Sequence, residues 1–243
     1  MAEPAKYYAN NTVKALTVFD TLARAGVRDI VFSSTAAVYG APEHNPIAES
    51  APLVPVNPYG ASKLASEFIL KDLTAAHGLH ATILRYFNVA GADLNGRTGQ
   101  RTKEATHLIK VAAEVATGRR AALQIFGEDY PTRDGTCVRD YIHVTDLADA
   151  HLAALTKHDR AGETRVFNCG YGTGHTVKEV AAMFGAVLGR PLPVQSRPRR
   201  AGDPPALVCD SRKLQAELGW RPEIASLRTI VETALRWEQR PPH

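Results

Sequence analysis

The sequence lacks the features that mark secreted and membrane proteins. It contains three cysteines, and their wide separation and odd number fit neither a disulfide framework nor the spacing of zinc ligands: Cys137, Cys169 and Cys209. No apolar run approaches the length of a membrane span, and the N-terminus has no charged-then-apolar signal pattern. We therefore expect a soluble protein of the reducing cytoplasm, without a metal site.

Long blocks of one charge are also missing. The 29 Lys/Arg residues exceed the 25 Asp/Glu residues by a net charge of +4, and they are scattered along the chain. This pattern favours an anionic small molecule at least as well as a nucleic acid. The apolar (44%) and charged (22%) fractions are those of a globular protein. A chain of 243 residues can hold one large α/β domain, or a domain with a smaller lobe.

Strand and helix patterns alternate along the chain. Strands are expected at residues 29–34, 80–87, 122–126, 165–169 and 192–195, and helices at 5–25, 58–77, 104–118, 144–157, 176–188, 211–218 and 224–237. Residues 127–140 read as a turn-rich segment. A broad apolar face is expected on the first helix, formed by Val13, Leu16, Val18, Phe19, Leu22 and Ala23. The alternation indicates a parallel α/β architecture, and proline-rich breaks near 197–205 suggest a second lobe after about residue 88.

The stretch with the clearest chemistry is Asn57–Lys63. Asn57 can cap a helix that begins at Pro58, and Tyr59 and Lys63 then project from one face, a turn apart. A phenol titrates near 10, but a neighbouring ammonium and the positive end of a helix both favour the phenolate. Lowering this pKa to about 7 takes roughly 4 kcal/mol. The alternative is an ordinary helix pair, which the spacing alone favours.

A second candidate follows the strand at 29–34. That strand delivers Ser33, Ser34 and Thr35 to its carboxyl end, where open α/β sheets bind their ligands. For Thr35 alone, a hydroxyl that simply caps the strand end is an equally good reading. Together, Thr35, Tyr59 and Lys63 favour a catalytic role.

Several segments carry a resemblance to a known family, in the expected order from end to end: YYANN (7–11), FSSTAAVYG (32–40), NPYGASK (57–63), RYFNVAGAD (85–93), IFGEDYPTRDGTCVRDYIHVTDLADAH (125–151) and PRRAGDPPAL (198–207). The chain resembles the extended short-chain dehydrogenase/reductases and, within them, the UDP-glucose 4-epimerases (UDP-galactose 4-epimerases). The Tyr-x-x-x-Lys pattern marks only the superfamily, whereas the segment around 127–144 is close to diagnostic for the epimerases.

The resemblance implies a Rossmann-like doubly wound parallel sheet with a smaller C-terminal α/β substrate lobe. Residues 1–88 would be the C-terminal portion of the NAD-binding Rossmann domain. Residues 89–243 would mainly form the UDP-sugar lobe, with a segment at about 122–157 returning to the Rossmann sheet. The family's glycine-rich GxxGxxG turn, which holds the NAD pyrophosphate, has no match in the sequence. We therefore expect an N-terminally truncated sheet that lacks roughly eighty to ninety residues and binds NAD weakly or not at all.

The same resemblance assigns the catalytic roles. The epimerases invert C4 of a UDP-hexose by transient oxidation with NAD. Tyr59 would be the base, Lys63 would lower its pKa and hold the nicotinamide ribose, and Thr35 would hydrogen-bond the 4-oxygen. Asn10 and Phe87 match further NAD contacts. The helices at 5–25 and 58–77 pair across a homodimer in this family, so a homodimer is expected.

The substrate contacts implied by the resemblance lie mostly in the second half of the chain. Arginines match the diphosphate with planar, permanently charged donors. The implied set is Asn88, His107, Gln124, Phe126, Arg139, Arg200, Asp203 and Leu207. His107 replaces a common asparagine, and Leu207 is intermediate between the residues that exclude and admit N-acetyl sugars. For Arg197, Arg199 and Arg200 the alternative is a solvated basic loop.

Other functions compete with the epimerase reading. A sugar-nucleotide 4,6-dehydratase needs an acid/base pair after the threonine, but Ala36 and Ala37 follow Thr35 here. A non-catalytic nucleotide-sugar-binding protein would keep the substrate residues without turnover. An RNA-binding module would show steeply salt-dependent affinity for polynucleotides.

Overall fold

The computed structural model describes residues 3–157 and 162–240. The chain divides into two compact units, each built from three segments. Unit 1 comprises Met1–Phe87, Asp149–Cys169 and Cys209–Trp220, and unit 2 comprises Asn88–Ala148, Gly170–Val208 and Arg221–His243. The sequence expectation placed the returning segment at about 122–157, whereas the strand that joins the sheet of unit 1 late in the chain lies at 164–169.

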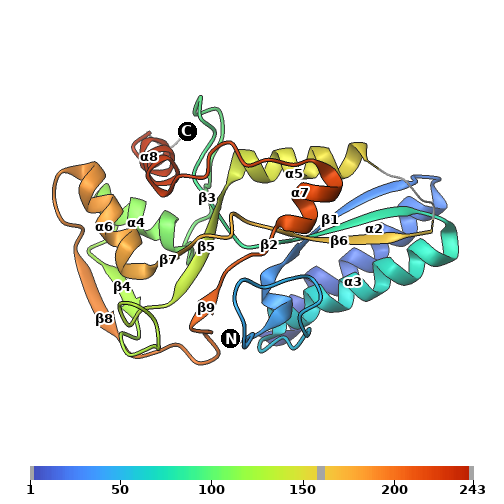
Figure 1. Ribbon diagram of the computed structural model, residues 1–243, viewed down its shortest axis with the longest axis horizontal. Helices are drawn as coiled ribbons and strands as arrows, with labels where there is room; N and C mark the ends of the chain where they lie inside the picture. Colours follow the sequence, from blue (N-terminus) through green and yellow to red (C-terminus); the bar gives the residue numbers. More distant parts are fainter. Residues whose placement is uncertain (1–2, 158–161, 241–243) are drawn as a thin grey trace. The chain divides into compact units, whose positions relative to one another are not determined.

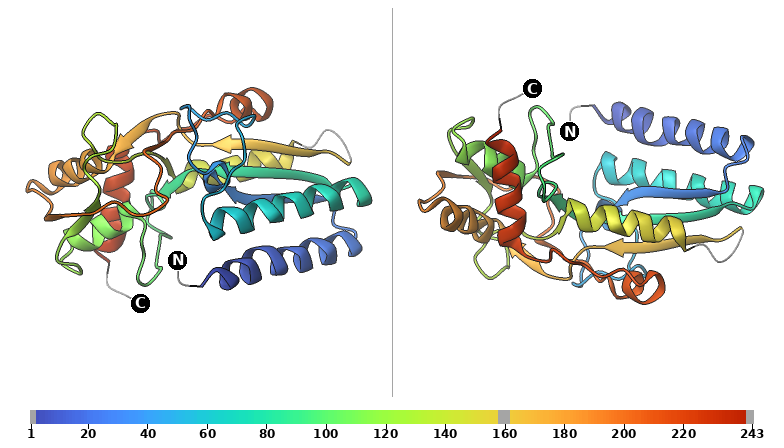
Figure 2. Two further views of the ribbon diagram at one scale, coloured as in Figure 1. Left: turned by 90° about the horizontal axis from the view of Figure 1, so that it is seen from below. Right: turned by 90° about the horizontal axis from the view of Figure 1, so that it is seen from above.

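Unit 1 is a parallel three-stranded sheet in the order β1-β2-β6 (Figure 1). Its strands are β1 (Asp29–Thr35), β2 (His80–Tyr86) and β6 (Thr164–Cys169). Helices α2 (Lys14–Arg24) and α3 (Pro58–His77) pack together against one face (Figure 2). The core between them consists of Phe19, Ala23, Ile30, Leu70, Leu79, Ala81 and Ile83. Because the strands are parallel, β1 and β2 end at the same edge, with Thr35 opposite Tyr86.

The N-terminal helix differs from the prediction of one helix at 5–25. It consists of α1 (Pro4–Tyr7), a π-helical turn η1 (Tyr8–Val13) and α2. Phe19 and Ala23 are buried, but Val13, Leu16 and Val18 are 60%, 45% and 52% exposed. The broad apolar face was therefore only partly right, because α2 contacts the core of unit 1 along a narrow stripe.

Helix α3 begins and ends as its sequence predicts. The Asn57 side chain accepts a hydrogen bond from the Gly60 N–H at 2.9 Å, which satisfies one of the donors left free in the first turn. Pro58 occupies the first helical position, and Gly78 ends the helix in the left-handed conformation (φ 64°). Because the helix begins at Pro58, Tyr59 and Lys63 lie in its first two turns.

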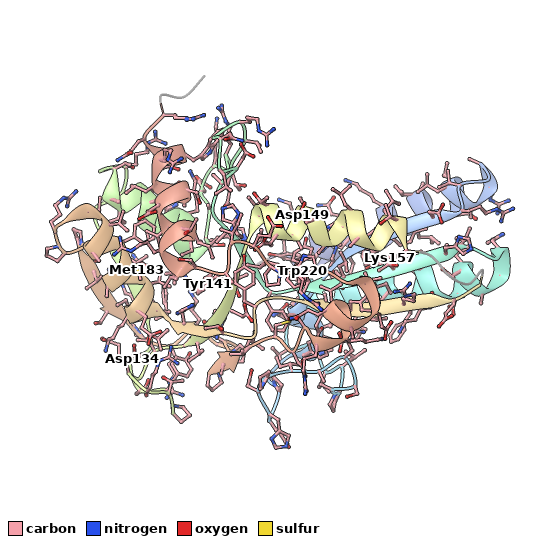
Figure 3. All side chains as sticks on the ribbon, turned by 45° about the horizontal axis from the view of Figure 1, so that its top comes forward. Asp134, Tyr141, Asp149, Lys157, Met183 and Trp220 are labelled. Atoms are coloured by element: carbon pink, nitrogen blue, oxygen red, sulfur yellow. The ribbon has the colours of Figure 1, made fainter. Side chains whose placement is uncertain are left out.

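Unit 2 contains two small sheets. One has the order β3-β5-β7, with β9 also paired to β5, and the other pairs β4 with β8. The strands are β3 (Asn88–Ala90), β4 (Leu123–Phe126), β5 (Val138–His143), β7 (Gly174–Thr176), β8 (Val194–Arg197) and β9 (Ala206–Leu207). Helices α4 (Leu108–Ala116), α6 (Val177–Leu188) and α8 (Leu227–Glu238) pack around a shared core. Tyr141 lies on β5 and Met183 on α6 (Figure 3).

Three further helices complete the described part of the chain. Helix α5 (Val144–Thr156) follows β5 directly, and α7 (Arg212–Leu218) belongs to unit 1, as does the short helix η2 (Ala36–Tyr39) after β1. Lys157 donates from its Nζ to the Leu218 carbonyl at 2.7 Å, which ties the end of α5 to the end of α7. No helix within the described ranges is long and apolar enough to cross a membrane.

The main correction to the predicted elements is β5. Residues 127–140 were expected to be turn-rich, but Val138–His143 is a strand that pairs in parallel with β3 and antiparallel with β7. Polar residues hid this strand from the pattern. Asp140 and His143 are fully buried on it, and the Asp140 carboxylate accepts the N–H groups of Tyr171 and Gly172 at 2.9 and 2.8 Å. Because these buried polar groups are hydrogen-bonded, the strand tolerates them, and its sequence lacks the apolar run from which a buried strand is predicted.

Candidate functional site

Three predicted catalytic residues meet at the carboxyl end of β1, within unit 1. The Tyr59 phenol is hydrogen-bonded to the Thr35 hydroxyl. The Lys63 Nζ donates to the Ser33 carbonyl at 2.5 Å and lies 4.3 Å from the centroid of the Phe32 ring. Helix α3 thus places the phenol beside Thr35 and the ammonium beside Ser33, two residues apart at one strand end. The structure brings Thr35, Tyr59 and Lys63 together as a cluster.

The electrostatics of this cluster differ from the sequence prediction. Burial raises the pKa of Tyr59, and the hydrogen bond from Thr35 opposes that rise. Burial lowers the pKa of Lys63, and the charge of Glu67 opposes that fall. The predicted lowering of the Tyr59 pKa is therefore wrong for this arrangement. Desolvation dominates, and the Lys63 ammonium is bonded to a backbone carbonyl.

Further side chains of unit 1 surround the cluster. The Ser33 hydroxyl lies 2.8 Å from His151 Nε2, and the Tyr86 phenol is hydrogen-bonded to Ser33. Phe87, a predicted NAD contact, is buried directly after β2. Asn10, the other such residue, is exposed on η1, where its side chain accepts a hydrogen bond from Lys14 at 2.7 Å.

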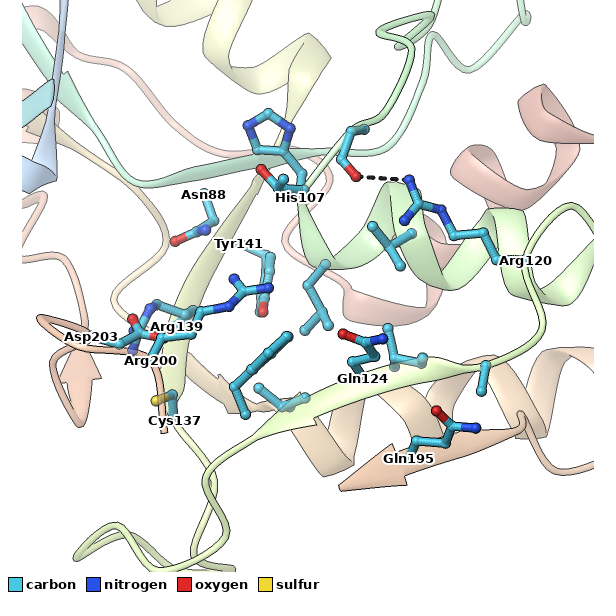
Figure 4. A pocket seen from close by; sticks show the side chains of 18 of the residues that line it. Asn88, His107, Arg120, Gln124, Cys137, Arg139, Tyr141, Gln195, Arg200 and Asp203 are labelled. Atoms are coloured by element: carbon cyan, nitrogen blue, oxygen red, sulfur yellow. Dashed lines mark hydrogen bonds and ion pairs between the residues drawn. The ribbon is translucent and has the colours of Figure 1, made fainter. Parts of the chain in front are cut away.

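Unit 2 contains a cavity of about 560 Å³, within the size range of small-molecule sites. Seven of the eight predicted substrate residues line it: Asn88, His107, Gln124, Phe126, Arg139, Arg200 and Asp203. Leu207 lies outside this lining set, but on β9 it stands opposite Arg139 of β5. Residues from 88 to 203 in the chain therefore converge on one cavity (Figure 4).

One side of the cavity is charged. Arg139 forms an ion pair with Asp203 and also donates to the Val138 carbonyl at 2.8 Å. The Arg200 guanidinium lies 3.6 Å from the centroid of the Phe126 ring, a cation–π distance. The side chains of Arg139, Arg200 and Asp203 gather together in Figure 4. Two guanidinium groups held by a carboxylate and a ring make a site for a compact anion.

The other side of the cavity carries amides. Gln124 on β4 stands opposite Gln195 on β8, and both line the cavity. His107 is exposed just before α4, and its Nδ1 lies 2.9 Å from the Gln100 amide nitrogen. Amide groups can both donate and accept hydrogen bonds, as a nucleobase edge requires.

Sequence reasoning missed five polar residues that line this cavity: Thr106, Arg120, Cys137, Tyr141 and Gln195. Two of them carried a readable signal. Cys137, Arg139 and Tyr141 alternate along the chain, so a strand at this position would have placed all three on one face. Because the strand itself was not predicted, the alternation went unused. Gln195 could be recognised as a cavity residue only from the structure, where β8 pairs with β4 and places it opposite Gln124.

Comparison with known proteins gives a consistent result. The model of the NAD dependent epimerase/dehydratase family matches residues 1–170. The UDP-glucose 4-epimerase of Azospirillum brasilense is 56% identical over 239 residues, which cover 98% of this chain and 69% of that protein. The UDP-glucose 4-epimerase of Corynebacterium glutamicum is 50% identical over 96% of this chain and 70% of its own length.

Solved structures agree with these relatives. The crystal structure of UDP-glucose 4-epimerase from Bifidobacterium longum in complex with NAD+ and UDP has a TM-score of 0.93 and 39% identity, and the match covers 98% of this chain and 71% of that one. The enzyme from Brucella ovis in complex with NAD has a TM-score of 0.92 and 43% identity, with 96% and 72% covered. The Rossmann-like fold expected from the sequence is confirmed.

Proposed function

Because the chain belongs to the NAD dependent epimerase/dehydratase family, we propose that it acts in the interconversion of UDP-glucose and UDP-galactose by epimerisation at C4 of the sugar. The observation that carries the proposal is the cavity of unit 2, on which seven of the eight predicted substrate residues converge. Relatives 56% and 50% identical bear the name UDP-glucose 4-epimerase, which supports the same substrate.

The substrate would bind through its diphosphate at the charged side of the cavity. Arg139 carries five N–H donors, so its bonds to Val138 and Asp203 leave donors for phosphate oxygens. Arg200, stacked on Phe126, would contribute a second permanent charge. Asp203 would accept the ribose hydroxyls, and Asn88 would donate to the diphosphate or sugar. The uracil would lie between the Phe126 ring and the Gln124 strand.

The proton chemistry would belong to the cluster at the end of β1. The Thr35 hydroxyl, already hydrogen-bonded to Tyr59, would bind the sugar 4-oxygen and relay its proton to the phenolate form of Tyr59. Burial raises the pKa of Tyr59 and so disfavours the phenolate, whereas the hydrogen bond from Thr35 favours it. The Lys63 ammonium, one helical turn away, would be the positive charge that favours the phenolate further. Positioned proton transfer of this kind contributes about 10²–10⁴-fold.

The same cluster fits one end of NAD, the cofactor of the family. The Lys63 ammonium has three donors, and its bond to Ser33 leaves others for ribose hydroxyls. It also lies at a carboxyl strand edge, where sheets of this type bind nucleotides. When bound, NAD would accept the hydride of the sugar C4 and return it to the opposite face. Phe87 and Asn10 are the other proposed contacts.

The dehydratase alternative finds no support at β1. Thr35 is followed by Ala36 and Ala37 at the start of η2, so an acid/base pair is missing from those two positions. The sugar preference would depend on Leu207. Its place opposite Arg139, on the strand next to the cavity, suits a residue that limits the size of the sugar substituent.

A cytoplasmic homodimer is the proposed form. The exposed apolar side chains of Val13, Leu16 and Val18, together with Phe68 on α3 (51% exposed), offer a surface for a second copy. Light scattering should give twice the chain mass. The three cysteines are buried and form no disulfide, which suits a reducing compartment.

Turnover of UDP-galactose in the presence of NAD tests the proposed function. Formation of UDP-glucose is the expected result, together with UDP binding measured by calorimetry. Binding of UDP without turnover would instead favour a non-catalytic nucleotide-sugar-binding protein. Failure to bind UDP at all would refute the site. Equal binding of polynucleotides at low salt would favour the RNA-binding alternative.

A further inference from the structure

Glu67 lies one turn beyond Lys63 on α3, as Lys63 lies one turn beyond Tyr59. Its carboxylate is fully buried and is paired with Arg85 of β2, which is 2% exposed. The Arg85 guanidinium donates two hydrogen bonds to the Glu67 carboxylate, from Nη2 to Oε2 at 2.6 Å and from Nε to Oε1 at 3.0 Å. A bidentate pair has a narrow geometry, and buried charges must keep their partners. The pair therefore fixes α3 against β2.

A second bond joins the same carboxylate to β1. The Ser34 hydroxyl donates to Glu67 Oε1 at 2.5 Å, and Ser34 is also fully buried. Ser34 stands between Ser33, whose carbonyl accepts the Lys63 ammonium, and Thr35, whose hydroxyl meets Tyr59. Glu67 is thus bonded to the middle residue of the strand end that holds the catalytic cluster.

The network extends across the sheet of unit 1. Arg85 donates from Nη1 to the Tyr39 phenol oxygen at 3.0 Å, and Tyr39 donates to the Asn168 side chain of β6 at 2.7 Å. Asn168 donates in turn to the Ile47 carbonyl at 2.8 Å. All three strands of unit 1 are therefore connected to Glu67 through buried hydrogen bonds.

We propose that Glu67 is a positioning residue for the Tyr59 base. Its bonds to Ser34 and Arg85 fix the axial position and rotation of α3, and these set the Lys63–Ser33 contact one turn earlier and the Tyr59–Thr35 contact two turns earlier. The inference rests on the catalytic role proposed for Tyr59. A carboxylate is required because it must accept from a hydroxyl and a forked guanidinium at once. Glutamine has only one accepting oxygen.

Three substitutions test this role. Glu67→Gln removes the charge, Ser34→Ala removes only the bond to β1, and Asp72→Asn is a matched control at an exposed acid of the same helix. The first readout is the ring resonance of Tyr59 in protein with isotope-labelled tyrosine, assigned by its loss in Tyr59→Phe. The second is kcat with UDP-galactose and NAD, set against the affinity for UDP.

Glu67→Gln and Ser34→Ala should both move the Tyr59 resonance. Glu67→Gln should also lower kcat by roughly 100-fold, the loss that a displacement of about 1 Å can cause. UDP affinity should stay unchanged, because the proposed UDP site is built from unit 2, and Asp72→Asn should match the parent chain throughout.

A folded Glu67→Gln variant with an unmoved Tyr59 resonance and parental kcat would overturn the inference, as would an equal loss of UDP affinity and kcat. If Glu67→Gln does not fold, Ser34→Ala decides: an unmoved Tyr59 resonance then overturns it. If the parent chain does not turn over UDP-galactose, the proposed function fails, and the resonance alone decides whether Glu67 positions Tyr59.

Discussion

At the scale of single residues, Tyr59 carries the proposed chemistry. Tyr59→Phe keeps the ring and removes the phenol oxygen that is bonded to Thr35. We expect turnover to fall by about 10²–10⁴-fold, the usual value of positioned proton transfer, with UDP affinity nearly intact. Steady-state kinetics and calorimetry measure the two effects. Tyr8→Phe, at a 43% exposed tyrosine of η1, is the control. Unchanged turnover in Tyr59→Phe would refute the assignment.

The guanidinium of Arg200 offers a residue-scale test of the substrate site. Arg200→Ala should weaken UDP binding by roughly 1.5–3 kcal/mol, the value of a hydrogen bond to a charged group. Arg199→Ala is a close control, because the Arg199 Nε is held by Asp129 at 2.7 Å and the residue lies outside the lining of the cavity. Calorimetry gives both affinities. Equal affinities for the two variants would mean that the diphosphate binds elsewhere.

At the scale of elements, α3 approaches the segment after β1 more closely than a side chain allows. A Cβ added at Gly60 would lie 2.4 Å from the Ala37 carbonyl oxygen. Gly60→Ala should therefore destabilise the protein by about 1–3 kcal/mol, although the same change usually stabilises a helix. In α6, a Cβ added at Gly185 would lie 3.4 Å from its nearest atom, which is ordinary contact. Gly185→Ala should therefore raise the free energy of unfolding by about 0.5–1 kcal/mol. Urea unfolding compares the two, and a stabilising Gly60→Ala would contradict the close approach.

The junction of β5 and α5 depends on a neutral histidine. His143 is fully buried, its Nδ1 accepts the Thr145 N–H at 3.1 Å, and its Nε2 lies 3.2 Å from the Thr233 hydroxyl. The His143 side chain thus caps α5, because it accepts one of the N–H groups that the first turn of a helix leaves without a partner. Burial lowers the pKa of His143 below the ordinary 6.5, against the raising effects of Asp146, the Ala92 backbone and Asp93.

This histidine makes stability depend on pH. Because its folded-state pKa lies below the unfolded value, the unfolded chain binds the proton more readily. The stability contribution is therefore complete above pH 6.5 and falls as the pH drops below it. His175, whose pKa burial also lowers, acts in the same direction. Urea unfolding across this range should show a shallower pH slope for His143→Gln than for the control His77→Gln, and equal slopes would contradict the prediction.

Some features of these elements could be predicted from the sequence, and others could not. The cap of α3 was predictable because Asn57 and Gly60 are neighbours in the chain. The Glu67–Arg85 pair was not, since its partners come from different elements and nothing local links them. The substrate residues were named by resemblance alone. Their meeting in one cavity depends on β5, whose buried Asp140 and His143 hid it from any apolar pattern.

At the scale of the whole molecule, the proposed substrate contacts lie in unit 2 and the proposed base lies in unit 1. UDP at a hundred times its Kd should stabilise the part that binds it by about 2.7 kcal/mol. Hydrogen exchange should therefore slow most in β4, β5 and α4, and less in β1 and α3. Protection confined to unit 1 would contradict the placement of the nucleotide.

The division of the chain into units also bears on how the protein is made. Each unit is assembled from three separated segments, and β6 joins β2 only after the first segment of unit 2, Asn88–Ala148, has been synthesised. Contacts between residues so distant in sequence form slowly, because a long loop must close before they are gained. The sheet of unit 1 therefore cannot be completed on the ribosome before the first segment of unit 2 has been made. Cutting the gene near codon 88 would leave a first product without β6 and α7, whereas the second product would keep every segment of unit 2.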